Sequence, residues 1–157
     1  MAELNDRLAR ELYQMAKDEL ADMGMEVEAD DAEMMLQFAY QGEDMEHRMY
    51  VEVNMAGSVI RTIEILPFTV NPDKTDGMLK AINYINKSLT IGTFWYDMDG
   101  SVFFTIPQLY YNSILSREAV RLQIMRTAEL VEDFDDRLVA VNKGYLAPEN
   151  IMQGLVD

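Results

Sequence analysis

The sequence contains no cysteine and a single histidine, and it has no long apolar run. The lack of cysteine excludes disulfides, thiolate metal sites and cysteine nucleophiles, and it is typical of a protein in a reducing compartment. No apolar run approaches the ~20 residues of a membrane span. The first twenty residues mix acids and bases, without the apolar core of a secretory signal. We therefore expect a cytoplasmic protein.

The common catalytic and nucleotide-binding motifs are also missing. The sequence has no G-x-x-x-x-G-K-[ST], G-x-G-x-x-G, H-E-x-x-H or G-x-S-x-G pattern. The one histidine, His47, falls on the apolar side of a predicted strand, where packing is a more ordinary role than catalysis. We therefore expect no enzyme activity, no cofactor and no bound metal.

Basic residues are scarce relative to acidic ones. Lys and Arg number 13 against 28 Asp and Glu, which gives a formal net charge of −15. Such a charge repels phosphate backbones and anionic headgroups, so it argues against nucleic acid and membrane partners. It favours a basic protein or a cation as partner, although the same charge also serves solubility alone.

The pattern of apolar residues predicts one domain with an α-β-β-β-α-β-β-α order. Helical spacing covers residues 3–23, a segment from about 76 to 89, and a long last helix from Ser116 to Gly144. Alternation and β-forming residues predict strands at 33–40, 46–54, 59–66, 93–96 and 101–106. We expect an α+β fold with an antiparallel five-stranded sheet and helices mainly on one face, spanning 1–145, followed by a tail at 146–157.

The second hairpin carries more apolar surface than one layer of helices can cover. A two-residue Asp99-Gly100 turn would set Trp95 opposite Phe104. One face then carries Trp95, Val102, Phe104 and Ile106, and the other carries Phe94, Tyr96, Met98 and Phe103. Either this chain covers both faces, or one face binds another protein. Because Asp97 shares the side of Trp95, we predict a protein-binding surface at Trp95, Val102, Phe104 and Ile106.

An acidic cluster on the last predicted helix supplies the alternative function. Glu129, Glu132, Asp133 and Asp136 fall on adjacent helical turns, where a divalent cation would relieve their repulsion. A carboxylate- or metal-dependent hydrolase that uses Glu129, Glu132 and Asp136 is the enzyme hypothesis. A solvated helix face explains the cluster more simply, because we expect no histidine or suitably spaced polar partner near it. A purely structural role in a larger assembly is a third option.

One stretch resembles a known family. Ala81-Ile82-Asn83-Tyr84-Ile85-Asn86, then Gly92-Thr93-Phe94, then Asp99-Gly100 resembles the YbjN-like family, in which an Asn-bearing helix leads into a Gly-x-Phe strand and an Asp-Gly hairpin. The order of elements is similar to that of the type III secretion chaperones. The resemblance implies a non-catalytic, chaperone-like or regulatory protein-binding module that forms a homodimer. By likeness to those chaperones, dimer contacts would lie on Leu79, Asn83 or Asn86 of the second helix.

Overall fold

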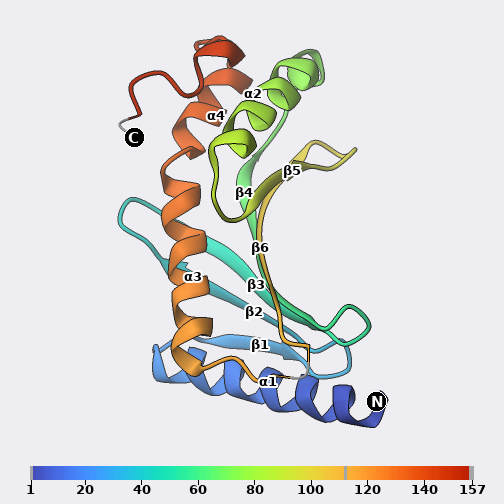
Figure 1. Ribbon diagram of the computed structural model, residues 1–157. Helices are drawn as coiled ribbons and strands as arrows, with labels where there is room; N and C mark the ends of the chain where they lie inside the picture. The colour runs from blue at the N-terminus through green and yellow to red at the C-terminus, as the bar shows by residue number, and fades with distance from the viewer. Residues whose placement is uncertain (1, 112, 156–157) are drawn as a thin grey trace.

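The computed structural model describes residues 2–111 and 113–155, and within these ranges six strands form one antiparallel sheet (Figure 1). The strand order across the sheet is β1-β2-β3-β4-β6-β5. The elements are α1 (Ala2–Asp22), β1 (Val27–Asp30), β2 (Met35–Gln41), β3 (Glu46–Asn54), β4 (Val59–Thr69), η1 (Pro72–Lys74), α2 (Thr75–Ser88), β5 (Thr93–Tyr96), β6 (Ser101–Leu109), α3 (Arg117–Glu132), α4 (Asp135–Asn142) and η2 (Pro148–Asn150).

The α+β class and the antiparallel sheet are confirmed, with two differences in detail. The acidic segment before the first predicted strand is itself a strand, β1, so the sheet has six strands in the described residues instead of five. The long last helix is two helices, because the backbone at Phe134 leaves the helical conformation (φ −127°) and its ring enters the core. Ser116 caps α3 as predicted, since its side chain accepts a hydrogen bond from the Ala119 N–H.

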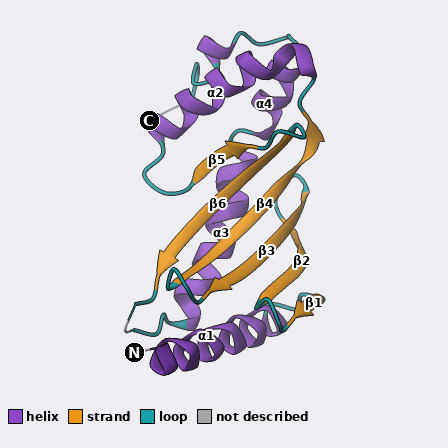
Figure 2. Ribbon diagram, turned by 90° about the vertical axis from the view of Figure 1, so that its right-hand side faces the viewer, coloured by secondary structure: helices purple, strands orange, loops and turns teal. Residues whose placement is uncertain are grey.

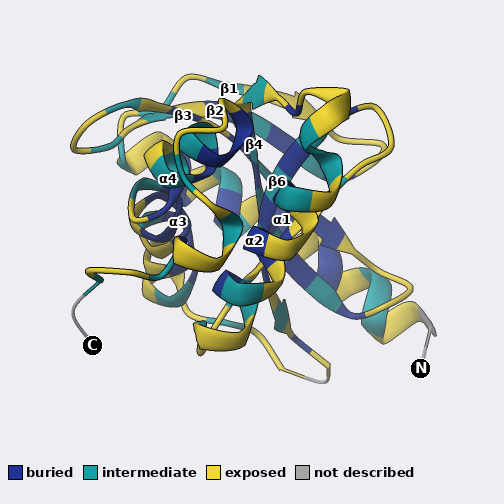
Figure 3. Ribbon diagram, turned by 90° about the horizontal axis from the view of Figure 1, so that it is seen from above, coloured by how far each residue is buried: buried dark blue, intermediate teal, exposed yellow. Residues whose placement is uncertain are grey.

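The helices bury one face of the sheet. At one end, α1 and the first half of α3 pack on β2, β3 and β4, around Leu12, Leu36, Met49 and Ile124. At the other end, α2 packs on β5 and α4 packs against α2, around a core that includes Met78, Ile85, Phe104 and Leu138. Seen from above, the buried residues lie toward the middle of the molecule and the exposed ones at its periphery (Figure 3). We call the buried side of the sheet the inner face.

The opposite side of the sheet carries no helix from the described residues. Figure 2 shows the sheet lying in front of α3, with its front surface uncovered. Along β3, β4 and β6 the buried residues alternate with partly exposed ones, as expected for a sheet covered on one side. We call this uncovered side the open face.

The hairpin of β5 and β6 has a register that differs from the predicted one. Trp95 pairs with Phe103 and Phe94 pairs with Phe104. The Asp97 N–H bonds to the Ser101 carbonyl, so the loop contains three residues, and Gly100 closes it in the left-handed conformation (φ 93°).

A shift of one residue moves every side chain of a strand to the other face of the sheet. Val102, Phe104 and Ile106 are therefore buried in the core, at most 1% exposed, and placing them on an exposed surface with Trp95 is wrong. Trp95 does lie at the surface, and it shares the open face with Phe103.

This register predicts opposite consequences for neighbouring aromatic residues. Phe104→Ala should lower the free energy of unfolding by about 3–5 kcal/mol, because it empties a buried site. Trp95→Ala should lower it less than Phe104→Ala does, because Trp95 is 40% exposed and its removal leaves no enclosed cavity; the stacking on Phe103 contributes about 0.5–1.5 kcal/mol beyond the area that it buries. Urea unfolding of the two variants measures both values. A larger loss in Trp95→Ala than in Phe104→Ala would contradict the observed pairing.

Candidate protein-binding face and buried histidine cluster

A row of apolar side chains crosses the open face from β3 to β5. The strand pairing sets Tyr50 beside Ile63, and Ile65 beside Phe103. The Trp95 ring stacks on Phe103 with 4.1 Å between ring centroids and 10° between planes. We call Tyr50, Ile63, Ile65, Phe103 and Trp95 the aromatic row. Its side chains remain partly exposed, and Trp95 is 40% exposed, so the row is apolar surface in contact with water.

The tryptophan of the row is held in one orientation. Its indole N–H donates a hydrogen bond to the Thr105 hydroxyl (2.9 Å), and its ring rests on Phe103. A fixed aromatic ring loses little conformational entropy when a partner covers it. Trp95 is therefore suited to act as an anchor for a bound molecule.

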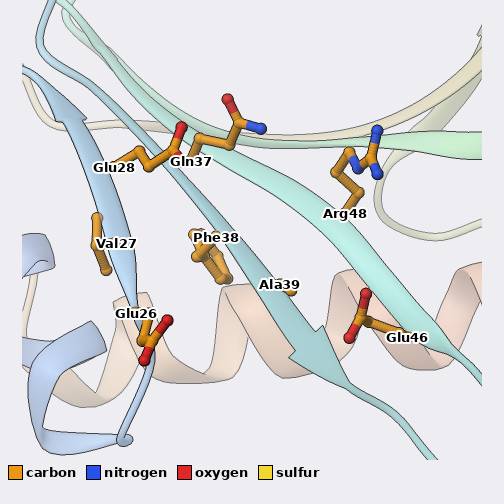
Figure 4. Close-up of a pocket in the computed structure, with 8 residues that line it drawn as sticks. All are labelled: Glu26, Val27, Glu28, Gln37, Phe38, Ala39, Glu46 and Arg48. Atoms are coloured by element: carbon orange, nitrogen blue, oxygen red, sulfur yellow. The ribbon is translucent and has the colours of Figure 1, made fainter.

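The other half of the open face is hollowed and acidic. A depression of about 440 Å³ lies over β1, β2 and β3. Glu28, Gln37 and Arg48 project from these three strands to the same side, and Glu26 and Glu46 also line the depression (Figure 4). We call this depression the acidic hollow. Its three carboxylates outnumber its one guanidinium, so its field attracts cations.

A second depression joins the acidic hollow to the aromatic row. It has a volume of about 330 Å³, and it shares Glu46 and Arg48 with the hollow and Tyr50 and Ile65 with the row. The open face is therefore one continuous surface, apolar on one side and acidic on the other.

The predicted dimer residues on α2 have different surroundings. Leu79 is exposed (45%), and so is Asn83. Asn86 is engaged within the chain, because its amide donates to the Phe94 carbonyl (2.8 Å) and accepts from the Phe94 N–H (2.9 Å). These are backbone groups that a further strand would use to pair with the edge strand β5. The amide of Asn86 thus ties α2 to β5.

Gly92, in the loop before β5, completes this connection. It has a positive φ of 81°, and a Cβ atom there would lie 2.3 Å from the Phe104 ring. The Asn and Gly-x-Phe residues of the motif therefore have a structural role in joining α2 to the hairpin. Dimer contacts through Leu79 and Asn83 remain a prediction.

The two asparagines of α2 allow a matched test. Asn86→Ala leaves both Phe94 backbone groups without their partner and should lower the free energy of unfolding by about 1–3 kcal/mol. Asn83→Ala, one turn earlier on the exposed side of the same helix, should change it by less than about 0.5 kcal/mol. Thermal and urea unfolding measure both. Equal losses would show that the Asn86 contacts are not stabilising.

The carboxylates of the enzyme hypothesis have different surroundings in the structure. Glu129 pairs with Arg126 (2.9 Å), Glu132 contacts His47, and Asp136 is exposed on α4. Among the described residues, no group of three or more His, Asp or Glu side chains has an arrangement that could hold a metal ion. The expectation that no histidine lies near this cluster is wrong, because the fold brings His47 to Glu132.

His47 is buried between two glutamates from distant parts of the chain. Its Nδ1 lies 2.6 Å from Oε1 of Glu64 on β4, and its Nε2 lies 3.0 Å from Oε1 of Glu132 on α3. The side chains of His47 and Glu64 are fully buried, and that of Glu132 is 15% exposed. The Asp44 N–H also donates to Oε1 of Glu132 (3.1 Å). We call His47, Glu64 and Glu132 the histidine cluster.

Burial and hydrogen bonding have opposite effects on the pKa values of these three groups. Burial lowers the pKa of His47, but the hydrogen bonds to Glu64 and Glu132 outweigh it and raise that pKa above its ordinary 6.5. Burial raises the pKa of Glu64, and His47 offsets only part of this effect. Burial also opposes ionisation of Glu132, but the bonds from His47 and from the Asp44 N–H bring its pKa below the ordinary value.

The histidine cluster predicts how stability depends on pH. Because the folded pKa of His47 lies above its unfolded value, its stabilisation is complete below pH 6.5 and is lost as the pH rises through the folded pKa. The free energy of unfolding should fall above pH 6.5, by at most about 1.4 kcal/mol per pH unit for one proton. Histidine is the only side chain whose ordinary pKa lies near this range, and Glu64, whose pKa burial raises, belongs to the same cluster. Urea unfolding from pH 6.5 to about pH 9 measures the slope, with His47→Gln as control. A flat profile in the unsubstituted protein would contradict the assignment.

Comparison with known proteins places the chain in a family. The family model of YbjN, described as "Putative bacterial sensory transduction regulator", matches residues 17–140. The chain belongs to the YbjN family. The match includes the Asn86–Phe94 connection, the aromatic row and the histidine cluster, and it ends before η2. The resemblance seen in the sequence is therefore confirmed for YbjN, and the likeness to the secretion chaperones stays a prediction.

A solved structure of the same family shares the fold. The crystal structure of YbjN from E. coli, presented there as "a putative transcription regulator", matches with a TM-score of 0.58. The alignment covers 83% of this chain and 91% of the E. coli chain at 12% sequence identity. No curated protein matches the chain. None of the described helices is both long and apolar enough to cross a membrane.

Proposed function

We propose that this member of the YbjN family is a non-catalytic regulatory adaptor that binds a protein partner on the open face of its sheet. The observation that carries the proposal is the aromatic row, an apolar strip across four strands that the described helices leave uncovered. Buried aromatic anchors supply most of the binding energy in many protein interfaces. The regulatory description of the family agrees with such a role.

The charge of the open face indicates what kind of partner would bind there. The acidic hollow lies beside the aromatic row, and the whole chain carries a net charge of −15. A partner that presents an apolar segment flanked by Lys or Arg would cover the row and place its cations near Glu26, Glu28 and Glu46. We propose a basic protein as the partner and the cytoplasm as the place of binding, with homodimerisation through Leu79 and Asn83 as a separate part of the proposal.

A capture experiment tests this function with a matched control. The tagged protein is incubated with extract of its source cell at about 0.1 M salt, and captured proteins are identified by mass spectrometry. Trp95→Ser should lose a specific partner at least about tenfold, because it removes the anchor. Tyr145→Ser removes an aromatic side chain that is 83% exposed and lies outside the open face, and it should retain the partner.

The charge of the interface is tested with the same partner. Binding should weaken several-fold between about 0.1 M and 0.5 M salt, and also in the double variant Glu28→Gln, Glu46→Gln. A partner that Trp95→Ser and Tyr145→Ser capture equally would contradict the open face as its site. A partner insensitive to salt and to the double variant would contradict the role of the acidic hollow.

A further inference from the structure

The histidine cluster holds one proton more than a neutral histidine between two carboxylates. A neutral imidazole has one N–H and one lone pair, whereas a carboxylate only accepts hydrogen bonds. Both ring nitrogens of His47 nevertheless lie within hydrogen-bond distance of a glutamate oxygen. The two contacts coexist when the ring is an imidazolium, or when the proton between Nδ1 and Glu64 rests on Glu64. In both cases the three groups share two protons.

Loss of one of these protons breaks one contact. A neutral His47 beside two ionised glutamates can donate to only one of them, and its remaining lone pair faces the other. Glu64 is fully buried on a central strand, and its Oε2 has no hydrogen-bond partner, so as a carboxylate it needs the N–H most. Glu132 is partly exposed at the last residue of α3. The contact between His47 and Glu132 is therefore the one that breaks.

The surroundings of Glu132 determine what its release changes. The turn between β2 and β3 closes over the cluster at Gly42, where a Cβ would lie 2.1 Å from Oε1 of Glu132 and 2.4 Å from Nε2 of His47. The Asp44 N–H holds the same turn on Glu132. A cavity of about 190 Å³ lies between this turn and α3, with Tyr40, Met125 and Glu132 in its wall. Departure of Glu132 separates the turn from α3 and extends the cavity to His47.

Other ionisable groups face the cluster from each neighbouring element. Tyr40 on β2 has its ring 6.2 Å from that of His47, and Asp135 at the start of α4 interacts electrostatically with His47 and Glu132. Glu43 and Asp44 belong to the turn itself and contact Glu132 through backbone N–H groups. When His47 becomes neutral, no positive charge of the cluster remains to offset the repulsion between Asp135 and Glu132, and this favours opening.

We propose that His47 is a proton-controlled latch that holds the β2–β3 turn on α3 through Glu132 and releases it when the ring loses its proton. The latch lies on the inner side of the sheet and does not depend on the partner proposed for the open face. Its geometry lets the cavity beside α3 reach His47 in one protonation state and keeps the ring out of the cavity in the other.

Nuclear magnetic resonance tests the latch directly, because His47 is the only histidine in the chain. With ¹⁵N-labelled histidine, the imidazole signals follow this one ring, and its midpoint should lie above pH 6.5. Across the same midpoint, the protection factor of the Asp44 amide against hydrogen exchange should fall at least about tenfold. The Gly57 amide, which donates to the Asn54 side chain in the next hairpin turn (2.7 Å), is the control and should not respond.

Two substitutions separate the latch from general charge effects. In His47→Gln no titrating ring remains between the two glutamates, so the Asp44 transition should disappear. Glu129→Gln, on the same helix as Glu132 and paired with Arg126, should leave the transition unchanged. The latch is refuted if His47 titrates while Asp44 in the unsubstituted protein does not respond, or if Asp44 and Gly57 respond alike. A His47 midpoint below 6.5 also refutes it.

Discussion

The three-residue loop closed by Gly100 decides which aromatic side chains of the hairpin enter the core. With Asp97 bonded to Ser101, Phe94 and Phe104 face the helices, and Trp95 and Phe103 face the other way. Gly100 adopts a left-handed conformation that most residues avoid. Because the helices of the described residues cover only the inner face, the stacked pair of Trp95 and Phe103 is exposed to solvent. The protein-binding surface that we propose thus depends on whether the hairpin loop contains two or three residues.

The inner face depends on polar contacts as well as apolar ones. Thr62 on β4 bonds to Thr127 on α3 (2.6 Å), and Gln123 on α3 donates to the Ile106 carbonyl of β6 (2.6 Å). Together with the histidine cluster, these contacts place a line of buried polar groups between α3 and the sheet. Buried polar groups that lose a partner destabilise the structure far more than exposed ones. A change of protonation at His47 therefore affects the contact between α3 and the sheet.

Much of the fold follows from local sequence, but the long-range contacts do not. Periodicity was enough to predict α1, α2 and five strands, and the Asn86 to Phe94 motif indicated the family. β1 was missed because Glu28 and Asp30 give an edge strand the polarity of a loop. The hairpin register was missed because two-residue and three-residue loops fit the same Asp99-Gly100 pair. The histidine cluster could not be predicted from local sequence, because the partners of His47 are 17 and 85 residues away. The one available signal was Glu64, a charged residue at a position that alternates with the exposed residues of β4.

Trp95 is the only tryptophan in the chain, so its fluorescence reports on the open face alone. The measurement is acrylamide quenching of Trp95, combined with sedimentation to establish the oligomeric state of the same sample. The isolated protein should show a readily quenched, red-shifted emission, and a partner that covers the aromatic row should protect Trp95 from acrylamide. A blue-shifted emission that acrylamide does not quench, in a protein that sediments as a strict monomer, would show that the chain covers this face itself.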